Sequence, residues 1–151
     1  MKDKILEAVQ ISKTYGEGES AVHALRNSDL TLENGTFASI IGSSGSGKST
    51  LLKILGGLLP PTTGKVLLDG QDIYAMNAEQ LAQVRRQKIG FIFQDFRLIG
   101  DKSVYENVAF AMRVIGAPEK EIRKRVPYVL ELVGLADREK RFPAELSGGE
   151  Q

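Results

Sequence analysis

The residues best suited to chemistry lie in one glycine-rich stretch of the chain. They are Gly42, Ser43, Ser44, Gly45, Ser46, Gly47, Lys48, Ser49 and Thr50, which match the pattern G-x-x-x-x-G-K-[ST] at every fixed position. Glycines let successive backbone N–H groups turn toward an anion, and a helix N-terminus adds partial positive charge. Lys48 would reach the β- and γ-phosphates, and the Ser49 hydroxyl would ligate Mg²⁺. The pattern therefore predicts a phosphate loop that binds a nucleoside phosphate.

The segments around this loop favour a nucleotide site over a flexible Gly/Ser linker. Thr36–Ile41 is an apolar run typical of a buried parallel strand, and Ser49–Leu55 begins a helix. Ile89–Phe93 is a second apolar run of the same kind, with Gln94 at its carboxyl end. Ligands of open α/β sheets bind at the carboxyl ends of the strands. We therefore expect Gln94 to face the ligand.

Further short strands are expected in the first half of the chain. They are Ile5–Ser12, Val22–Leu25, Asp29–Leu32 and Lys65–Leu68. Val66–Asp69 resembles the apolar strand whose terminal Asp binds magnesium in NTPases with a phosphate loop. Gly70 follows, however, and a hairpin turn explains the Asp69–Gly70 pair. Tyr15 lies in a predicted loop, Lys13–Glu19, and has two interpretations: a partly buried loop aromatic, or a ring that stacks on a purine.

The second half of the chain is predicted to be helical. Asn77–Val84 precedes it as a short capped helix, and Ser103-x-x-Glu106 is a capping box for the next one. Pro118–Val133 carries one apolar stripe with Gly134 as its C-cap, and Pro127 predicts a kink or break within it. Ser147-x-x-Glu150 is another capping box at the end of the chain, where we expect the last residues to fray.

Composition limits the kinds of protein that remain. A chain of 151 residues with 42% hydrophobic content is long enough for one core, and its net charge of +1 offers no general attraction for nucleic acid. The absence of cysteine excludes disulfides and thiolate metal sites. The first ten residues lack the apolar core of a secretory signal, and no apolar run approaches the roughly 20 residues that span a bilayer. We therefore expect a soluble protein.

Three motifs together resemble one family. The loop GSSGSGKST, Gln94 after an apolar strand, and the terminal LSGGEQ are similar to the nucleotide-binding domain of ATP-binding cassette (ABC) ATPases. The resemblance implies an α/β P-loop NTPase core with N-terminal antiparallel β strands and a helical subdomain. It implies a phosphate-loop β core over residues 1–93 and a helical subdomain over residues 94–151. ATP and Mg²⁺ are the implied ligands.

The resemblance also implies roles for individual residues. Tyr15 would stack on adenine, and Gln94 would contact Mg²⁺ and the attacking water and sense a membrane subunit. Lys48 and Gln94 are then the candidate catalytic residues, and Ser49 and Gln94 the candidate metal ligands. Two domains of this family pack head to tail, so Ser147, Gly148 and Gly149 would bind the γ-phosphate held by the phosphate loop of a second copy.

The membrane partner is inferred from finer likenesses. From Phe93 onward the sequence looks like the cell-division ATPase FtsE, which works with the membrane protein FtsX. The first ninety or so residues look more like macrolide- or lipoprotein-export ATPases of the MacB and LolD type, so the chain has a hybrid character, natural or engineered. We expect an FtsX-like or exporter-type integral membrane partner, and a cytoplasmic location on the inner face of the cell membrane.

Other residues of the family have no match here. Its magnesium-binding Asp, catalytic Glu and switch His follow the signature, so we expect a domain truncated before the Walker B strand; His23 lies far upstream and cannot take the switch role. We hypothesise that this chain binds ATP weakly and hydrolyses it negligibly, as a silent fragment of a parent ATPase. A DNA-repair ATPase of the same superfamily is the alternative class, but heptads and cysteines are missing.

Overall fold

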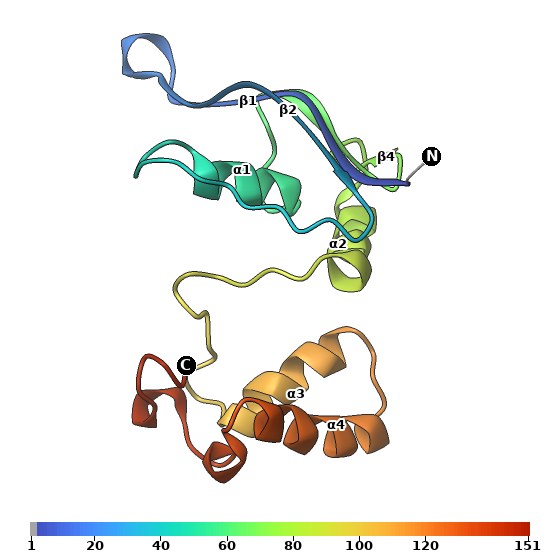
Figure 1. The fold of residues 1–151 in the computed structure, drawn as a ribbon, viewed down its shortest axis with the longest axis vertical. Coiled ribbons are helices and arrows are strands. Elements are labelled where there is room, and N and C mark those ends of the chain that lie inside the picture. Colours follow the sequence, from blue (N-terminus) through green and yellow to red (C-terminus); the bar gives the residue numbers. More distant parts are fainter. Residues whose placement is uncertain (1–2) are drawn as a thin grey trace. The chain divides into compact units, whose positions relative to one another are not determined.

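The computed structural model describes residues 3–151, and it divides into two compact units. The first ends at Gly90, and the second is Phe91–Gln151. The first contains a sheet with two helices, and the second contains helices without a sheet (Figure 1). Each has its own cluster of buried side chains. The expectation of one core is therefore wrong, because the apolar residues of each half pack among themselves.

The sheet of the first unit is antiparallel and has the order β2-β1-β3-β4. Its strands are β1 (Lys4–Tyr15), β2 (Val22–Glu33), β3 (Thr63–Leu68) and β4 (Gln71–Asp72). β1 and β2 form a long hairpin in which Tyr15 pairs with Val22. Two predictions are corrected here. Tyr15 belongs to a strand rather than a loop, and the two short strands predicted after residue 21 are one, because pairing with β1 continues across the polar residues between them.

The turn between β3 and β4 is the hairpin that the sequence predicted. Asp69 and Gly70 both have positive φ, 49° and 76°. Two successive left-handed residues define the tight turn whose twist matches that of the flanking strands. The Asp69 carboxylate accepts a hydrogen bond from Lys88 Nζ at 2.5 Å. Asp69 is thus a turn residue, and its carboxylate is already paired.

The core of the first unit lies between the sheet and helix α1 (Lys48–Leu55). Its buried members are Ala8, Ile11, Ile54, Leu55, Val66 and Ile73. The Tyr74 hydroxyl lies within hydrogen-bond distance of two carbonyl oxygens, that of Ile54 at 2.7 Å and that of Leu59 at 2.6 Å. Burial raises the pKa of Tyr74 to about 12. This tyrosine therefore fastens the carboxyl end of α1, and with it the helix that follows the phosphate loop.

Helix α2 (Ala78–Lys88) begins with the predicted cap and runs further than predicted. The Asn77 side chain accepts from Gln80 N–H at 2.9 Å, and the Gln80 side chain accepts from Asn77 N–H at 3.1 Å. Both halves of the capping box are present, which satisfies two amides that have no partner inside the helix. The basic residues near its carboxyl end suit the helix dipole there.

Two segments predicted as buried parallel strands are extended but unpaired. Residues 36–41 form no ladder in the described part of the chain, and Phe37 and Ile41 are 95% and 91% exposed. Residues 89–93 also lack strand pairing, and Ile92 is 97% exposed. A parallel strand needs neighbours brought alongside by crossover connections. The described chain places no strand beside either segment, so both predictions are wrong for this structure.

The second unit is built around a pair of helices, α3 (Val104–Val114) and α4 (Glu119–Leu132) (Figure 1). Its buried members are Val104, Ala109, Ile122, Val126 and Leu130. The spacing of the last three, four residues apart, places them on one face of α4, as the sequence pattern predicted. Ser103 caps α3 by accepting from Glu106 N–H at 3.2 Å. The Glu106 carboxylate accepts from Arg113 instead of completing the box.

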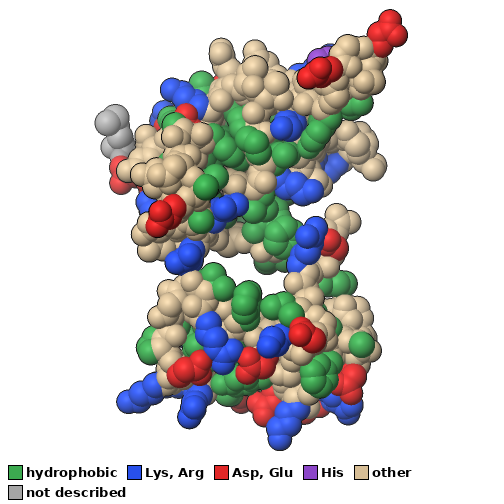
Figure 2. All heavy atoms as spheres, turned by 180° about the vertical axis from the view of Figure 1, so that it is seen from behind, with side chains coloured by type: hydrophobic (Ala, Val, Ile, Leu, Met, Phe, Trp, Pro, Cys, Tyr) green, Lys and Arg blue, Asp and Glu red, His purple; other side chains and the backbone are tan. Residues whose placement is uncertain are grey.

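Helix α4 continues through Pro127, so of the predicted kink or break the break is wrong, and the kink stays a prediction. A proline lacks one donor, but this one lies on the exposed side of a helix whose other face is packed. The carboxyl end is as predicted: Gly134 has φ 72°, and Leu135 N–H donates to Leu130 O at 2.8 Å. On the face shown in Figure 2, Lys and Arg are mixed with Asp and Glu in both units. No helix among residues 3–151 is long and apolar enough to cross a bilayer.

Candidate functional site

The phosphate loop ends at Gly47, which caps α1 in the left-handed conformation with φ 88°. A β-carbon at this position would lie 2.2 Å from the carbonyl oxygen of Ala24 in β2. No side chain fits in that space, so the glycine lets the loop approach the strand. The loop is thereby held against β2, and the first turn of α1 points its unpaired N–H groups toward the loop.

The loop curls around the ammonium group of Lys48. Lys48 Nζ donates to Gly42 O at 2.9 Å, to Ser43 O at 2.6 Å and to Ser46 Oγ at 3.3 Å. A β-carbon on Gly42 would lie 2.7 Å from Ser46 Oγ, so this position is also closely packed. The lysine therefore already lies inside the curve where phosphate oxygens would bind. This cradle of glycines and ammonium fits a nucleotide's phosphates.

The hydroxyl that would hold Mg²⁺ is on the first turn of α1. Ser49 is exposed there, next to Lys48. Residues 3–151 hold no group of three or more His, Asp or Glu side chains placed to bind a metal ion. Ser49 fits the part of one oxygen ligand of a magnesium ion that a nucleotide brings with it. Mg²⁺ would there neutralise charge that develops on the phosphate oxygens.

Tyr15 lies at the end of β1 and is 44% exposed. Lys13 Nζ is 5.4 Å from the centre of its ring and donates to Pro60 O at 2.8 Å. Tyr15 pairs with Val22, two residues along β2 from Ala24, which packs against Gly47. Two residues of a strand span roughly 7 Å. The structure therefore brings the exposed aromatic ring and the phosphate loop to the same end of the β1–β2 hairpin.

Gln94 lies in the second unit, in a turn directly after the extended residues 91–93, and its side chain is exposed. The segment is ordered by aromatic contacts: the rings of Phe91 and Phe93 are 4.7 Å apart, and Arg97 lies over Phe93 at 5.1 Å. The predicted position at the end of a strand is therefore replaced by a turn. Its predicted contact with magnesium and water remains a prediction.

The terminal motif forms a hydrogen-bonded turn, not a frayed end. Ser147 N–H and Oγ–H both donate to Glu150 Oε2, at 2.8 and 2.7 Å. Glu150 N–H donates to Ser147 O at 3.0 Å, and the Gln151 amide donates to Pro143 O at 2.8 Å. Gly148 and Gly149 lie at the exposed tip, where a β-carbon would have no neighbour within 4 Å. The prediction of fraying did not take these four bonds into account, three of which involve side chains.

One residue of this region was not singled out from the sequence. Arg138 ends the 3₁₀ helix Ala136–Arg138; its Nε donates to Glu150 Oε1 at 3.1 Å and its Nη1 to Asp137 Oδ2 at 2.6 Å. Hydrogen bonds from Ser147, followed by the one from Arg138, lower the pKa of Glu150 to about 2. Sequence spacing gave no signal, because Arg138 precedes Glu150 by more than the three or four residues that neighbours on a helix share.

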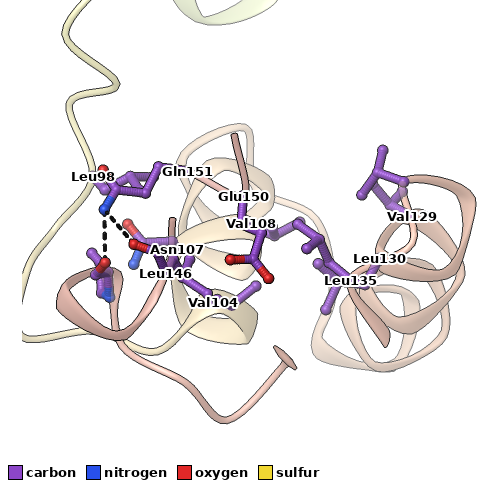
Figure 3. Close-up of a pocket in the computed structure, with 12 residues that line it drawn as sticks. Leu98, Val104, Asn107, Val108, Val129, Leu130, Leu135, Leu146, Glu150 and Gln151 are labelled. Carbon is purple, nitrogen blue, oxygen red and sulfur yellow. Dashed lines mark hydrogen bonds between the residues drawn. The ribbon is translucent and has the colours of Figure 1, made fainter. Parts of the chain in front are cut away.

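An apolar hollow of about 130 Å³ opens beside the same turn. Leu98, Val108 and Leu146 line it together with Glu150 and Gln151 (Figure 3), and Val133 is also part of its lining. Exposed side chains nearby on the helices include Val133 at 62% and Leu132 at 66%. Amphipathic helices taken singly do not reveal such a hollow, since its walls come from different segments. It is large enough to admit one or two small apolar side chains.

Known proteins resemble this chain over nearly its whole length. A family model described as ABC transporter matches residues 25–151. The methionine import ATP-binding protein MetN of Chromohalobacter salexigens is 46% identical over 141 residues, which are 93% of this chain and 40% of that protein. An uncharacterized ABC transporter ATP-binding protein of Thermotoga maritima is 48% identical over 148 residues, 98% of this chain and 63% of that protein.

A solved structure agrees with these relatives. The dimer of the ATP-binding cassette MJ0796 in a post-hydrolysis state, bound to ADP and Pi, has a TM-score of 0.90 and 37% identity. The match covers 97% of this chain and 65% of that chain. This chain spans less than two thirds of the length of each of these three proteins.

Proposed function

Because the chain belongs to the ABC transporter family, we propose that it is part of the ATP-binding and ATP-hydrolysing subunit of a membrane complex. The observation that carries the proposal is the phosphate loop, in which Gly47 is packed against β2 and Lys48 lies inside the curve of the loop. On binding, phosphate oxygens would replace the carbonyl oxygens as acceptors for Lys48. Charge-assisted bonds of this kind are stronger than bonds to neutral carbonyls.

The proposed site has two halves that come from two copies of the chain. In one copy Gly42–Thr50 binds the phosphates, Tyr15 stacks on adenine, Ser49 ligates Mg²⁺, and Gln94 orients the attacking water. In the other copy Ser147, Gly148 and Gly149 offer backbone and hydroxyl groups to the γ-phosphate. The exposed tip at Gly148 and Gly149 supports this role, because backbone there can approach a ligand closely.

Nucleotide binding is tested by the thermal melting of the 151-residue chain with and without Mg-ATP. A ligand that binds only the folded state stabilises it by about 2.7 kcal/mol at 100 times its dissociation constant. We expect an upward shift of Tm that Lys48→Ala removes. Lys53→Ala is the matched control, since Lys53 is an exposed lysine of the same helix. An equal shift in Lys48→Ala would contradict the proposal.

We infer that the chain by itself turns ATP over very slowly. General bases contribute about 10²- to 10⁴-fold to rates. The proposed catalytic residues, Lys48 and Gln94, include no such base. Steady hydrolysis by the purified chain, abolished by Lys48→Ala, would overturn this inference while leaving the binding site in place.

The partner that we propose is an integral membrane subunit, with the protein held at the inner, cytoplasmic face of the cell membrane. The apolar hollow bordered by Leu98, Val108 and Val133 supports this, because it can receive apolar side chains of a partner helix. Leu98→Asp is expected to weaken association with the membrane subunit without changing the ATP-induced shift of Tm. Retention of the partner in a pull-down would argue against this surface.

We propose that the membrane complex imports methionine, and we favour this function over one in cell division. MetN proteins that are 40% to 46% identical to this chain support it. The FtsX-like partner inferred from the second half, and the exporter inferred from the first, remain hypotheses. Methionine uptake by cells that depend on the gene is the deciding measurement. Normal uptake together with a septation defect would favour the FtsX-like partner instead.

A further inference from the structure

The turn Ser147–Gln151 contains a carboxylate beside the groups proposed to meet a phosphate. Glu150 Oε2 accepts both the N–H and the Oγ–H of Ser147. A serine hydroxyl has one proton to donate. While Ser147 donates that proton to Glu150 in a hydrogen bond, its Oγ can offer a phosphate oxygen only lone pairs. The turn as it stands is therefore ordered but not yet arranged to bind an anion through its hydroxyl.

The negative charge of Glu150 is a second obstacle to phosphate binding at Ser147. A γ-phosphate brought to Ser147 by a second copy would lie close to this carboxylate, and like charges repel. The repulsion is largest when the carboxylate has no cation beside it. In this structure Arg138 Nε lies 3.1 Å from the other oxygen, Oε1. Arg138 thus contacts the carboxylate oxygen of Glu150 that Ser147 does not contact.

Arg138 is itself held in place by its surroundings. Asp137 Oδ2 accepts from its Nη1 at 2.6 Å, and its carbonyl oxygen accepts from Arg141 N–H at 2.8 Å. Arg141 O in turn accepts from Val104 N–H, the first residue of α3, at 2.8 Å. The guanidinium therefore projects from a segment that is bonded to the start of α3. Its backbone is anchored, and the carboxylates of Asp137 and Glu150 both accept from its partly exposed guanidinium.

We propose that Arg138 is a positioning residue of the nucleotide sandwich: it holds Glu150 and cancels its charge, so that Ser147 can turn its hydroxyl to the γ-phosphate on a second copy of this chain. The inference rests on the proposed function, because it assumes that Ser147–Gly149 meets ATP in trans. It adds a residue outside the three motifs. Arg138 touches neither nucleotide nor magnesium in this scheme and acts only through Glu150.

The test uses the full chain and its Arg138→Met variant, which keeps the length of the side chain and removes its charge. The dissociation constant of the dimer at saturating Mg-ATP is measured by analytical ultracentrifugation, and ATP affinity by calorimetry. We expect dimerisation to weaken about fivefold, the upper end of the range for a partly exposed ion pair. ATP affinity should change less than about twofold. Hydrogen exchange at Ser147 N–H should become faster.

Two further variants separate charge from structure. If uncancelled charge is the cause, Glu150→Gln added to Arg138→Met restores dimerisation, and Arg138→Lys retains most of it. Arg141→Met is the matched control: Arg141 pairs with Glu145 at the same 3.1 Å, but Glu145 accepts from Phe142 and not from Ser147. Arg141→Met should dimerise like the wild type.

The outcomes distinguish the inference from the proposed function. The role of Arg138 is overturned if Arg138→Met dimerises as tightly as the wild type. It is also overturned if adding Glu150→Gln to Arg138→Met does not restore dimerisation. Either result leaves the sandwich intact. A wild-type chain that binds Mg-ATP but stays monomeric overturns the sandwich and this inference together. A chain that fails to bind ATP at all overturns the proposed function at its first step.

Discussion

The two units of this protein treat their apolar segments differently. In the helical unit the apolar stripe of α4 is buried as the spacing predicts, with Ile122 fully covered. Residues 36–41 of the sheet unit, and residues 89–93 where the first unit ends and the second begins, stay unpaired, and Ile41 is 91% exposed. The β1–β2 and β3–β4 hairpins of the sheet unit are paired in antiparallel ladders.

The difference follows from where each segment's partner lies. A helix satisfies its own backbone, and α3 and α4 are neighbours in the chain, so their stripes meet without help. An antiparallel hairpin likewise finds its partner across a short turn. A parallel strand depends on partners that distant segments must bring. Apolar content alone therefore predicts burial well where the partner is local and poorly where it is remote.

The largest expected effects are core truncations, one in each unit. Ile54 and Ile122 are both 0% exposed, and each belongs to a different cluster. Replacing either by alanine should lower the free energy of unfolding by about 2–5 kcal/mol. Hydrogen exchange followed by mass spectrometry should show faster exchange only in the unit that carries the change. Leu132→Ala, at an exposed position, is the control. Faster exchange throughout after either change would mean that the units fold together.

A smaller effect is expected from a methyl group at glycines of similar backbone conformation. Gly47→Ala combines positive φ with a clash on Ala24 O, whereas Gly45 and Gly134 have positive φ and no neighbour within 4 Å. Left-handed backbone costs alanine about 1–2 kcal/mol. Gly45→Ala and Gly134→Ala should lose that amount on urea unfolding, and Gly47→Ala clearly more, with loss of ATP binding. Equal losses at all three positions would show that the contact with β2 is unimportant.

The next effect concerns Tyr74 and depends on pH. Burial raises its pKa to about 12, above the ordinary 10.0. Its contribution to stability is therefore complete below about pH 10 and is lost as the pH rises to about 12. Tyr74→Phe should lower the free energy of unfolding by about 1–2 kcal/mol at pH 8, since the hydrogen bond that the hydroxyl donates to the Ile54 and Leu59 carbonyl oxygens is lost, and by less at pH 11.5. Urea titrations at both pH values measure this, with Tyr128→Phe as an exposed control. A gap that widens with pH would contradict it.

The smallest effect is expected where the sequence predicted a buried strand. Ile92 is 97% exposed, so Ile92→Ser should change the free energy of unfolding by less than about 0.5 kcal/mol. Ile73→Ser, at a position that is 0% exposed, is the matched control and should cost several times more. Chemical denaturation measures both. A loss of about 2 kcal/mol for Ile92→Ser would mean that residues 89–93 are paired in solution.

Local signals in the sequence determined much of this protein. The fold class and the family are as predicted, and so are the caps at Asn77 and Gly134 and the turn at Asp69 and Gly70. Each of these depends on residues within a few positions of one another, whose geometry is set by backbone dihedral angles and capping bonds. The curl of residues 42–48 around Lys48 is of this kind, because its glycines and lysine are close in the chain, while phosphate binding by this loop stays a prediction.

Tertiary structure alone decided the features whose partners are far apart. Packing of Gly47 on Ala24 places the phosphate loop near Tyr15, and Arg138 meets Glu150 across a turn and a 3₁₀ helix. Pairing with β1 made one strand of β2, while residues 36–41 found no partner. Helix α4 continues through Pro127 because the burial of its apolar face stabilises the helix by more than the loss of one backbone hydrogen bond costs. Burial and pairing are properties of three-dimensional neighbours, which spacing along the chain does not reveal.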